Sequence, residues 1–363
     1  MSLSIGIVGM PNVGKSTLFN ALTHAGAKVS NYPFSTIDKN VGVVAVPDKK
    51  LWHLNELLKP KECLPTTIQF IDIAGLVKGA SKGEGLGNKF LGHIREVDAV
   101  IHVVRCFRDE NVSHVSGNVD PLRDIDVVSI ELALADLETT EKAISKMDKT
   151  VKTDPRHEGK DALEALTKIR DGLREGRNVM EVGLTAEEKE LLKSYNLLTM
   201  KPTLYVANVD EADLGKEPQM LKAIKGAVGE ENVIVVSVKI EEEISELPED
   251  EQGSFLADLG LSESGMESVI LAGYRLLNLI TFYTIANDKL RAWQALRGTK
   301  APQAAGKIHS DMERGFIRAE VVSYQDLEKH KAMAQLHHHG LVRVEGKDYE
   351  IRQDDVVHFL FNV

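Results

Sequence analysis

The chain contains 363 residues, which is too long for one ordinary hydrophobic core, so we expect two or three compact units. Hydrophobic residues make up 43% of the sequence and charged residues 27%, as in soluble globular proteins, and no apolar run reaches the ~20 residues of a membrane span. The net charge of -11 argues against a general nucleic-acid coat, because affinity for phosphate backbones comes from Lys and Arg.

The N-terminus leads directly into a predicted strand. Residues 1–8 show neither a basic start nor a small-residue cleavage site, so we expect no secretory signal. The two cysteines, Cys63 and Cys106, form no C-x-x-C or zinc-type pattern and are expected to be reduced and structural. These features predict a cytoplasmic protein that does not cross a membrane.

Strand and helix patterns alternate through the first part of the chain. Residues 4–9 (SIGIVG) form an apolar run that ends at a glycine, and residues 15–25 follow with apolar positions at helical spacing. This alternation predicts a doubly wound α/β sheet. Further strands, most of them rich in β-branched residues, are predicted at residues 41–46, 67–73, 99–104, 203–207 and 233–238.

About a hundred residues separate the strands at 99–104 and 203–207, far more than a usual connection in such folds. Within this stretch, residues 129–149 and 161–174 show amphipathic helical spacing among many charged residues. We expect two antiparallel helices that form an inserted arm of coiled-coil type. The alternative is that these helices pack on the sheet as ordinary cover.

After an acidic segment at residues 241–252, predicted as a surface loop, and an apolar helix at 268–278, the pattern changes. Short strand-like segments with Gly and Asp turns between them follow, and they predict a small β-rich domain at the end of the chain. These segments are residues 281–283, 291–295, 317–322, 341–344 and 356–361.

Residues 9–17 (GMPNVGKST) match the phosphate-binding motif G-x-x-x-x-G-K-[ST], which chance would place in such a chain about once in a hundred cases. The preceding strand and following helix are the context that a P-loop requires. Its glycines let backbone N–H groups point at phosphates, Lys15 neutralises the β and γ phosphate oxygens during catalysis, and Ser16 offers its hydroxyl to Mg2+. The predicted nucleotide-binding residues of this motif are Asn12, Val13, Gly14, Lys15, Ser16 and Thr17.

Two further elements complete the predicted switch. The sequence Asp72-Ile-Ala-Gly75 ends a strand that faces the P-loop, so Asp72 is expected to hold Mg2+ through water and the Gly75 N–H to meet the γ-phosphate. Thr36 lies between the first helix and the second strand, where a switch threonine completes the Mg2+ shell. An ordinary loop hydroxyl is the alternative for Thr36.

These three elements in this order resemble the translation-factor-related GTPases and, within them, the Obg-like subgroup. Residues 72–92, residues 104–107 (VRCF) and residues 301–320 are so similar to the YchF family, over essentially the full length, that the chain is identified as a member. The resemblance implies a P-loop nucleotide-binding domain with an inserted helical coiled-coil arm, followed by a TGS domain of ubiquitin-like β-grasp form. The expected boundaries are 1–125 with 200–278 for the nucleotide-binding domain, 126–199 for the arm and 279–363 for the TGS domain.

The base-reading motif departs from that of ordinary GTPases. A guanine site carries N-K-x-D, whereas this chain has Asn208-Val-Asp-Glu211, so Glu211 is a methylene too long and Val209 lacks the lysine stem that covers the base. Asn208 and nearby backbone groups can satisfy adenine, while each unpaired guanine donor would cost roughly 1–3 kcal/mol. We predict ATP over GTP, as the family resemblance also implies. Ser237, in Ser237-Val-Lys239, is expected to line the base pocket.

The predicted catalytic machinery is also unusual. Leu76 follows Gly75 where many GTPases place the glutamine that orients the attacking water, so intrinsic hydrolysis should be slow. The resemblance implies a loop histidine in its place, and His114 is the candidate, although spacing alone ranks it no higher than His102 or His93. Asn12 resembles the asparagine by which some relatives bind K+, which leads to the hypothesis that K+ replaces an arginine finger.

Two classes of function are consistent with the sequence. The family resemblance implies a slow ATPase switch that associates with the large ribosomal subunit, and the alternative is a nucleotide-gated binding module whose partner affinity is the output. We expect a monomer. The run His337–His339 is interpreted as surface rather than a metal site. Basic residues near Phe316 and Tyr324 indicate RNA or ribosome contact by the TGS domain, or only a solvated sheet face: Lys300, Lys307, Arg314, Arg318 and Lys329.

Overall fold

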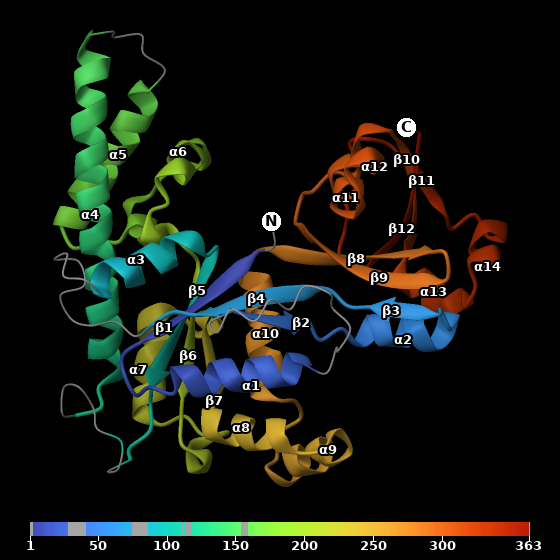
Figure 1. Ribbon diagram of the computed structural model, residues 1–363, viewed down its shortest axis with the longest axis horizontal. Helices are drawn as coiled ribbons and strands as arrows, with labels where there is room; N and C mark the ends of the chain where they lie inside the picture. Colours follow the sequence, from blue (N-terminus) through green and yellow to red (C-terminus); the bar gives the residue numbers. More distant parts are fainter. Residues whose placement is uncertain are drawn as a thin grey trace. The chain divides into compact units, whose positions relative to one another are not determined.

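The computed structural model describes residues 3–27, 41–74, 86–109, 112, 118–153 and 159–362 of the chain. Contacts between residues divide the chain into two compact units. Two six-stranded sheets form the frame of the described residues (Figure 1). Unit 1 contains residues 1–28, 32–42 and 69–269, and unit 2 contains residues 29–31, 43–68 and 270–363.

The first sheet, called the parallel sheet below, has the strand order β2-β4-β1-β5-β6-β7. Strand β1 pairs in parallel with β4 and β5, and the pairs β5–β6 and β6–β7 are parallel as well. Every residue of β1 and β5 is buried, which explains their almost entirely apolar sequences. The six expected strands are all present, as Ser4–Gly9 (β1), Val41–Ala45 (β2), Thr67–Asp72 (β4), Ala99–Arg105 (β5), Thr203–Asn208 (β6) and Val233–Val236 (β7).

Strand β1 is the point at which the strand order of the parallel sheet reverses, with β4 on one side and β5 on the other. In doubly wound sheets, ligands bind outside the carboxyl ends of the strands at such a point. The carboxyl end of β1 is Gly9, the first residue of the glycine-rich motif. The fold therefore positions this motif at the edge where a ligand is expected.

The segment at residues 241–252, predicted as a surface loop, is helical instead. Pro248 is the N-cap of α9, a position where the missing N–H of proline costs no intrahelical hydrogen bond. The prediction of a loop was therefore wrong, because an acidic, proline-containing segment also suits the start of a helix. Outside the arm, the helices before the second sheet are α1 (Lys15–Ala27), α2 (Lys49–Leu58), α3 (Leu86–Glu96), α7 (Gln219–Val228), α8 (Val238–Glu246), α9 (Glu249–Asp258) and α10 (Gly265–Leu276), with short 3-10 helices at Glu211–Asp213 (η5) and Glu230–Asn232 (η6).

The inserted arm is formed by α4 (Pro121–Thr153) and α5 (Lys160–Arg174), which lie side by side in Figure 1. With 33 residues, α4 is about 50 Å long at the helical rise of 1.5 Å per residue. Leu166 of α5 and Ile144 of α4 pack into one apolar cluster, whereas Ile125 in the first turns of α4 packs into the core of the parallel sheet. Both interpretations of the sequence thus hold, each for a different part of α4.

Asp136 joins the arm to the chain that returns to the parallel sheet. Its carboxylate accepts hydrogen bonds from the backbone N–H of Leu198 at 2.7 Å, and from the N–H and the hydroxyl of Thr199 at 2.8 Å each. Burial raises the pKa of Asp136, although these hydrogen bonds act in the opposite direction. The short helices of this returning segment are Val179–Val182 (η2), Ala186–Leu192 (α6), Lys193–Tyr195 (η3) and Leu198–Met200 (η4).

The second sheet, called the mixed sheet below, has the strand order β11-β10-β12-β8-β9-β3. Strands β8 and β9 form an antiparallel hairpin whose two turn residues, Asn287 and Asp288, have φ values of 53° and 60°. A type I′ turn requires positive φ at both positions, and Asn and Asp tolerate it well. The strands are Glu62–Leu64 (β3), Leu279–Ala286 (β8), Lys289–Leu296 (β9), Phe316–Ser323 (β10), Arg343–Glu345 (β11) and Asp355–Phe361 (β12).

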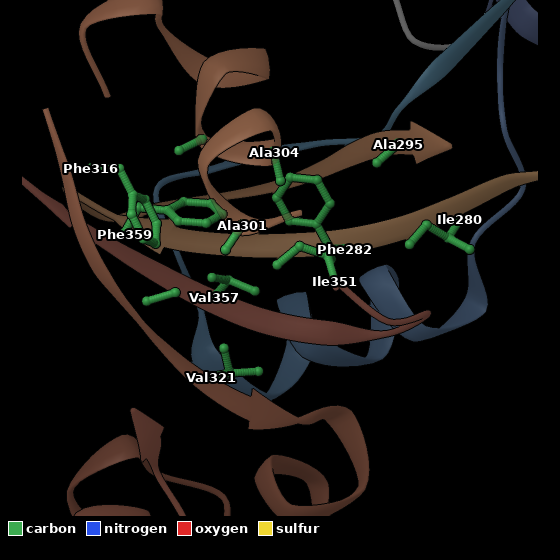
Figure 2. Close-up of a cluster of buried hydrophobic side chains, with 12 residues drawn as sticks. Ile280, Phe282, Ala295, Ala301, Ala304, Phe316, Val321, Ile351, Val357 and Phe359 are labelled. Carbon is green, nitrogen blue, oxygen red and sulfur yellow. The ribbon is translucent and has the colours of Figure 1, made fainter. Parts of the chain in front are cut away.

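Helices cover both faces of the mixed sheet. On one face, Phe282, Val357 and Phe359 of the strands pack with Ala301 and Ala304 of α11, as Figure 2 shows. On the other face, a second apolar cluster joins the sheet to α2, α13 and α14. The helices of this part of the chain are Ala301–Ile308 (α11), Ser310–Arg314 (α12), Tyr324–His330 (α13) and Met333–His338 (α14).

Residues 43–68 belong to unit 2, whereas the sequence-based boundary assigns the whole of 1–125 to the nucleotide-binding domain. Strand β3 lies at the edge of the mixed sheet and pairs in parallel with β9. The side chain of Asp48, which caps α2, accepts a hydrogen bond from the Tyr283 hydroxyl of β8 at 2.9 Å. A strand of three residues carries almost no pattern of its own, so the sequence did not reveal this placement.

No helix among the described residues has the length and apolar character needed to cross a membrane. Cys63 and Cys106 are both free. Burial raises the pKa of the Cys63 thiol to about 11 and that of Cys106 to about 12, which disfavours the reactive thiolate. The structure therefore agrees with a structural role for both.

Candidate nucleotide-binding site

The P-loop is a tight turn between β1 and α1. Within it, Asn12 has a φ of 62° and Gly14 a φ of 93°, both in the left-handed region. The backbone N–H of Leu18 then donates to the carbonyl of Gly14 at 2.9 Å, which is the first hydrogen bond of α1. The unsatisfied N–H groups at the start of this helix are the ordinary receptors of phosphate groups.

Two glycines of the motif are required by close approach. A Cβ atom on Gly9 would lie 2.7 Å from the carbonyl oxygen of Val103 in the neighbouring strand β5. A Cβ atom on Gly14 would clash with the side-chain amide nitrogen of Asn208, in addition to the strain of its positive φ. Both positions therefore exclude larger residues for reasons of packing as well as of phosphate access.

The structure brings Lys15, Ser16 and Asp72 together. The Lys15 ammonium lies 2.5 Å from one carboxylate oxygen of Asp72, with the two side chains 12% and 19% exposed. The Ser16 hydroxyl donates to the other oxygen of Asp72 at 3.5 Å. Asp72 reaches this place because β4 ends there, in parallel register with β1. A hydroxyl and a carboxylate are oxygen ligands of the kind that Mg2+ prefers, so the predicted metal residues that are described fit this ion.

Asn208 holds two loops of the site in place. Its side-chain amide donates to the carbonyl of Val13 in the P-loop at 3.0 Å, and its side-chain oxygen accepts from the N–H of Val238 at 3.0 Å. The residue is 5% exposed. Val238 is the first residue of α8 and follows Ser237, which is buried at the N-cap position. Asn208 thus connects the P-loop to the segment expected to line the base pocket.

The other two residues of the base motif lie in different surroundings. Val209 is buried in the core cluster with Leu221 and Ile224, and its N–H donates to the carbonyl of Val236 at 2.8 Å. Glu211 is exposed and begins the short helix η5. The Val209 side chain therefore packs in the core, and a part of either residue in base recognition stays a prediction.

Two family models match the chain. One, named YchF-GTPase_C, has the description of a protein of unknown function and matches residues 279–362. The other, described as a 50S ribosome-binding GTPase, matches residues 4–154. A protein from Bacillus subtilis named Ribosome-binding ATPase YchF is 52% identical over 370 residues, with 100% of each chain covered. The chain belongs to the YchF family.

Further comparisons agree with membership of the YchF family. A relative of the same name from Haemophilus influenzae is 50% identical over 365 residues and also covers 100% of both chains. The solved structure of the Schizosaccharomyces pombe YchF GTPase matches with a TM-score of 0.89 at 38% identity, covering 99% of this chain and 98% of that one. A GTP binding protein from Pyrococcus horikoshii OT3, 18% identical with a TM-score of 0.61, shares the fold. These structural matches confirm the fold class predicted for this chain.

Several predicted residues of the YchF-type site, namely Thr36, Gly75 and His114, lie outside the described residues, as does Leu76. Their roles stay predictions. The competing candidate His102 lies inside β5, is 3% exposed and has a pKa lowered to about 4 by burial. A buried, neutral histidine in the middle of a strand does not reach the P-loop edge, so His102 is excluded as a water-positioning group.

The C-terminal sheet of this YchF-family chain does not offer the aromatic stacking surface that the sequence indicated. Phe316 is 6% exposed and Tyr324 is 7% exposed, since both belong to the apolar clusters of the mixed sheet. The ammonium of Lys300 lies 2.8 Å from Asp348, and Arg314 forms an ion pair with Asp311. Both rings are therefore in the core, Phe316 at the start of strand β10 and Tyr324 at the start of helix α13, and RNA contact by this sheet stays a prediction.

The three histidines at residues 337–339 are exposed, which agrees with their interpretation as surface residues. No group of three or more His, Cys, Asp or Glu side chains that could hold a metal ion occurs in the described part of the chain. Arg105 entered the sequence analysis only as part of residues 104–107, with no role assigned to it, although it is the one charged residue in the apolar run of β5.

Proposed function

We propose that this chain binds ATP with Mg2+, hydrolyses it slowly and works as a molecular switch that associates with the ribosome. The observation that carries the proposal is the convergence of Lys15, Ser16 and Asp72 at the start of α1, on the edge where doubly wound sheets bind ligands. Full-length relatives with the name Ribosome-binding ATPase support both the nucleotide and the partner.

The geometry of Lys15 and Asp72 defines how the site would receive a nucleotide. The ammonium of Lys15 neutralises the carboxylate of Asp72 in the structure, and the phosphates of a nucleotide compete for the same ammonium. Ser16 and Asp72, together with Thr36, would hold Mg2+, which supplies positive charge against the phosphate oxygens. Lys15 then stabilises the charge on the transferred phosphoryl group, and the N-terminus of α1 orients it.

The proposed preference for ATP over GTP depends on Asn208 and Glu211. One donor and one acceptor position of the Asn208 amide are already used by Val13 and Val238, which leaves one of each for a base. Adenine needs an acceptor for its N6 amine and a donor for N1, so one remaining pair is sufficient. Guanine presents two donors that an Asp normally accepts, and the exposed Glu211 at this position is longer than Asp.

The proposed catalysis is slow because Leu76 replaces the glutamine that orients water in many GTPases. We propose that His114 positions the water and that Gly75 meets the γ-phosphate. We also propose that K+ binds beside Asn12, whose left-handed backbone shapes the P-loop. A rate that stays the same when Na+ replaces K+ would remove this last element from the mechanism.

The proposed partner is the large ribosomal subunit, with the chain acting as a monomer. The model that matches residues 4–154 has the description of a 50S ribosome-binding GTPase, which supports this choice. RNA contact by unit 2 would depend on Lys and Arg contacts to phosphate, such as those of the half-exposed Arg318, rather than on stacking. Affinity for ribosomal RNA should then fall steeply with salt.

Calorimetric titration of the purified chain with ATP and with GTP, in the presence of Mg2+ and K+, tests the proposed nucleotide. We expect ATP to bind at least tenfold more tightly, a difference of about 1.4 kcal/mol. In a matched titration, the Asn208→Ala variant should bind both ATP and GTP more weakly, because the Asn208 side chain also holds the P-loop through its hydrogen bond to Val13. Equal or tighter binding of GTP by the unmodified chain would contradict the proposed specificity.

A nucleotide-gated binding module is the second candidate function, favoured by the absence of a glutamine after Gly75. Turnover measured with and without 50S subunits distinguishes the two functions. The ATPase switch requires turnover to rise when the subunits are added. The binding module requires subunit affinity to differ between the ATP and ADP states while turnover stays flat.

A further inference from the structure

Arg105, the last residue of β5, is buried in an unusual environment. It is only 1% exposed, although it carries a guanidinium group. Its Nε donates to the carbonyl of Phe107 at 3.2 Å, one Nη donates to the carbonyl of Val112 at 3.1 Å, and the other Nη donates to the carbonyl of Asp109 at 3.2 Å. The guanidinium also lies over the Phe107 ring, 4.5 Å from its centroid. One side chain thus gathers three main-chain groups of the segment that follows β5.

This arrangement makes the side chain and the segment depend on each other. A buried guanidinium without acceptors is strongly unfavourable, so Arg105 can stay buried only while these carbonyls surround it. Conversely, each carbonyl that loses its donor inside the protein is left unsatisfied, which destabilises the folded chain. The planar fork of Arg also directs its donors to fixed positions, which a Lys ammonium cannot reproduce. The main-chain positions of Phe107, Asp109 and Val112 are therefore determined largely by Arg105.

The segment begins at the nucleotide-binding edge of the parallel sheet. Arg105 is paired in register with Asn208 of β6, and the N–H of Cys106 donates to the Asn208 carbonyl at 2.8 Å. The side chain of Asn208 in turn donates to Val13 of the P-loop. On its other side, β5 borders β1, where the start of the P-loop at Gly9 leaves no room for a Cβ beside Val103. The residues that Arg105 orders are thus continuous with the P-loop through two hydrogen bonds.

We propose that Arg105 is a positioning residue for nucleotide hydrolysis: it holds the main chain at Phe107, Asp109 and Val112 in the arrangement that the hydrolytic site requires, without touching the nucleotide itself. The inference rests on the proposed function, in which His114, two positions after Val112 in the sequence, positions the water. An error in the position of a catalytic group of about 1 Å reduces rates by about a hundredfold. The loss of Arg105 should therefore affect the chemical step more than nucleotide affinity.

The test compares Arg105→Met and Arg105→Lys with Arg95→Met in the full chain. Arg95 is a matched control, because it donates to the carbonyl of Asn196 at 3.2 Å and to the Thr139 hydroxyl at 2.9 Å, at the base of the arm. Three quantities are measured for each variant: the dissociation constant of ATP by calorimetry, the single-turnover rate constant at saturating Mg-ATP, and the melting temperature. The measurements are repeated with GTP if the unmodified chain hydrolyses GTP faster.

For Arg105→Met we expect a single-turnover rate constant at least tenfold below that of the unmodified chain, with the dissociation constant changed less than threefold. Arg105→Lys, which retains a buried charge but not the fork, should show a loss in the same direction that is smaller than that of Arg105→Met but larger than twofold. Arg95→Met should hydrolyse at the unmodified rate at a similar melting temperature. This pattern separates positioning from general destabilisation.

Two results would overturn the inference. One is an Arg105→Lys or Arg105→Met protein that hydrolyses within twofold of the unmodified chain. The other is a parallel loss of rate, ATP affinity and melting temperature in Arg105→Lys, which would assign Arg105 to the stability of unit 1 alone. If Arg105→Met does not fold, Arg105→Lys decides between these outcomes. Failure of the proposed function gives a different result: the unmodified chain would then hydrolyse neither ATP nor GTP.

Discussion

The two sheets of the molecule differ in how they use distant parts of the sequence. In the parallel sheet, all carboxyl ends of the paired strands meet at one edge, so Gly9, Asp72 and Asn208 come together although they are far apart in the chain. The mixed sheet contains antiparallel and parallel pairs, and both of its faces are covered by helices. A parallel sheet therefore brings functional side chains together at one edge, whereas the mixed sheet is a scaffold packed on both faces.

The mixed sheet instead depends on polar anchors between segments that are remote in sequence. The Tyr283 hydroxyl donates to both carboxylate oxygens of Asp48, at 3.0 and 2.9 Å, and Lys50 forms an ion pair with Asp354. These contacts join residues 43–68 to the C-terminal strands. We therefore predict that substitutions in the parallel sheet alter ligand binding and acid stability. Substitutions at the polar contacts of the mixed sheet should alter the free energy of unfolding alone.

The largest expected effect is on acid stability, through His102 of the parallel sheet. Its pKa is lowered to about 4 by burial, from the ordinary histidine value of 6.5, so the unfolded chain binds a proton more readily than the folded one. Stability is therefore fully present above pH 6.5 and is lost as the pH falls from 6.5 towards 4, by about 3 kcal/mol in total and about 2 kcal/mol between pH 7 and pH 5.

The His102→Leu variant should lack this part of the pH dependence, because leucine has no proton to gain. Thermal unfolding by calorimetry at pH 7 and pH 5 measures the difference between the unmodified chain and the variant. Asp48, the N-cap of α2, acts in the opposite direction. Burial raises its pKa, so the folded chain binds this proton more readily than the unfolded one and gains stability as the pH falls. An identical pH dependence of both proteins would show that His102 is protonated without cost.

Next in size is the loss of nucleotide binding in Lys15→Met. Removal of the ammonium eliminates charge-assisted hydrogen bonds to phosphate of about 1.5–3 kcal/mol each, so ATP affinity should fall about a hundredfold or more. Calorimetric titration checks this, and the melting temperature should change little because, among the described residues, Lys15 forms its ion pair with the partly exposed Asp72. Lys225→Met, which removes a partly exposed lysine paired with Glu217 and Glu230, is the matched control and should bind ATP normally.

The smallest of these effects is expected for Tyr283→Phe in the mixed sheet. The substitution retains the ring but removes the donor to Asp48, and the less satisfied carboxylate should cost about 1–2 kcal/mol of stability. Urea unfolding followed by circular dichroism measures the loss. Tyr195→Phe, which removes a contact to the sulfur of Met147 in the arm, is the control. A drop in ATP affinity with Tyr283→Phe would contradict the division of roles between the two sheets.

Local patterns were sufficient for much of the fold. The strands of the parallel sheet are apolar runs or, in β4, an alternating pattern, the P-loop is nine contiguous residues, and the segments predicted after residue 279 overlap strands β8 to β12. The arm was also predictable, because α4 and α5 show the helical spacing of apolar residues that their shared core uses. Patterns of this kind depend only on neighbours in the sequence, so they can be interpreted without a structure.

The tertiary structure decided what depends on residues far apart in the chain. The bridge of Asn208 between Val13 and Val238, and the ion pair of Lys15 with Asp72, exist because parallel register aligns the strand ends. Packing likewise placed Phe316 and Tyr324 in the core and residues 43–68 in unit 2.

The sequence by itself thus determined the P-loop, the strands of the parallel sheet and the YchF family, because each of these depends on contiguous residues. Only the tertiary structure showed which side chains position the loops of the nucleotide-binding site. Arg105 is the clearest case, since in the sequence it is a charged residue at the end of an apolar run. Its acceptors are main-chain carbonyls, which every residue possesses, so no pattern of side chains in the sequence predicts these contacts.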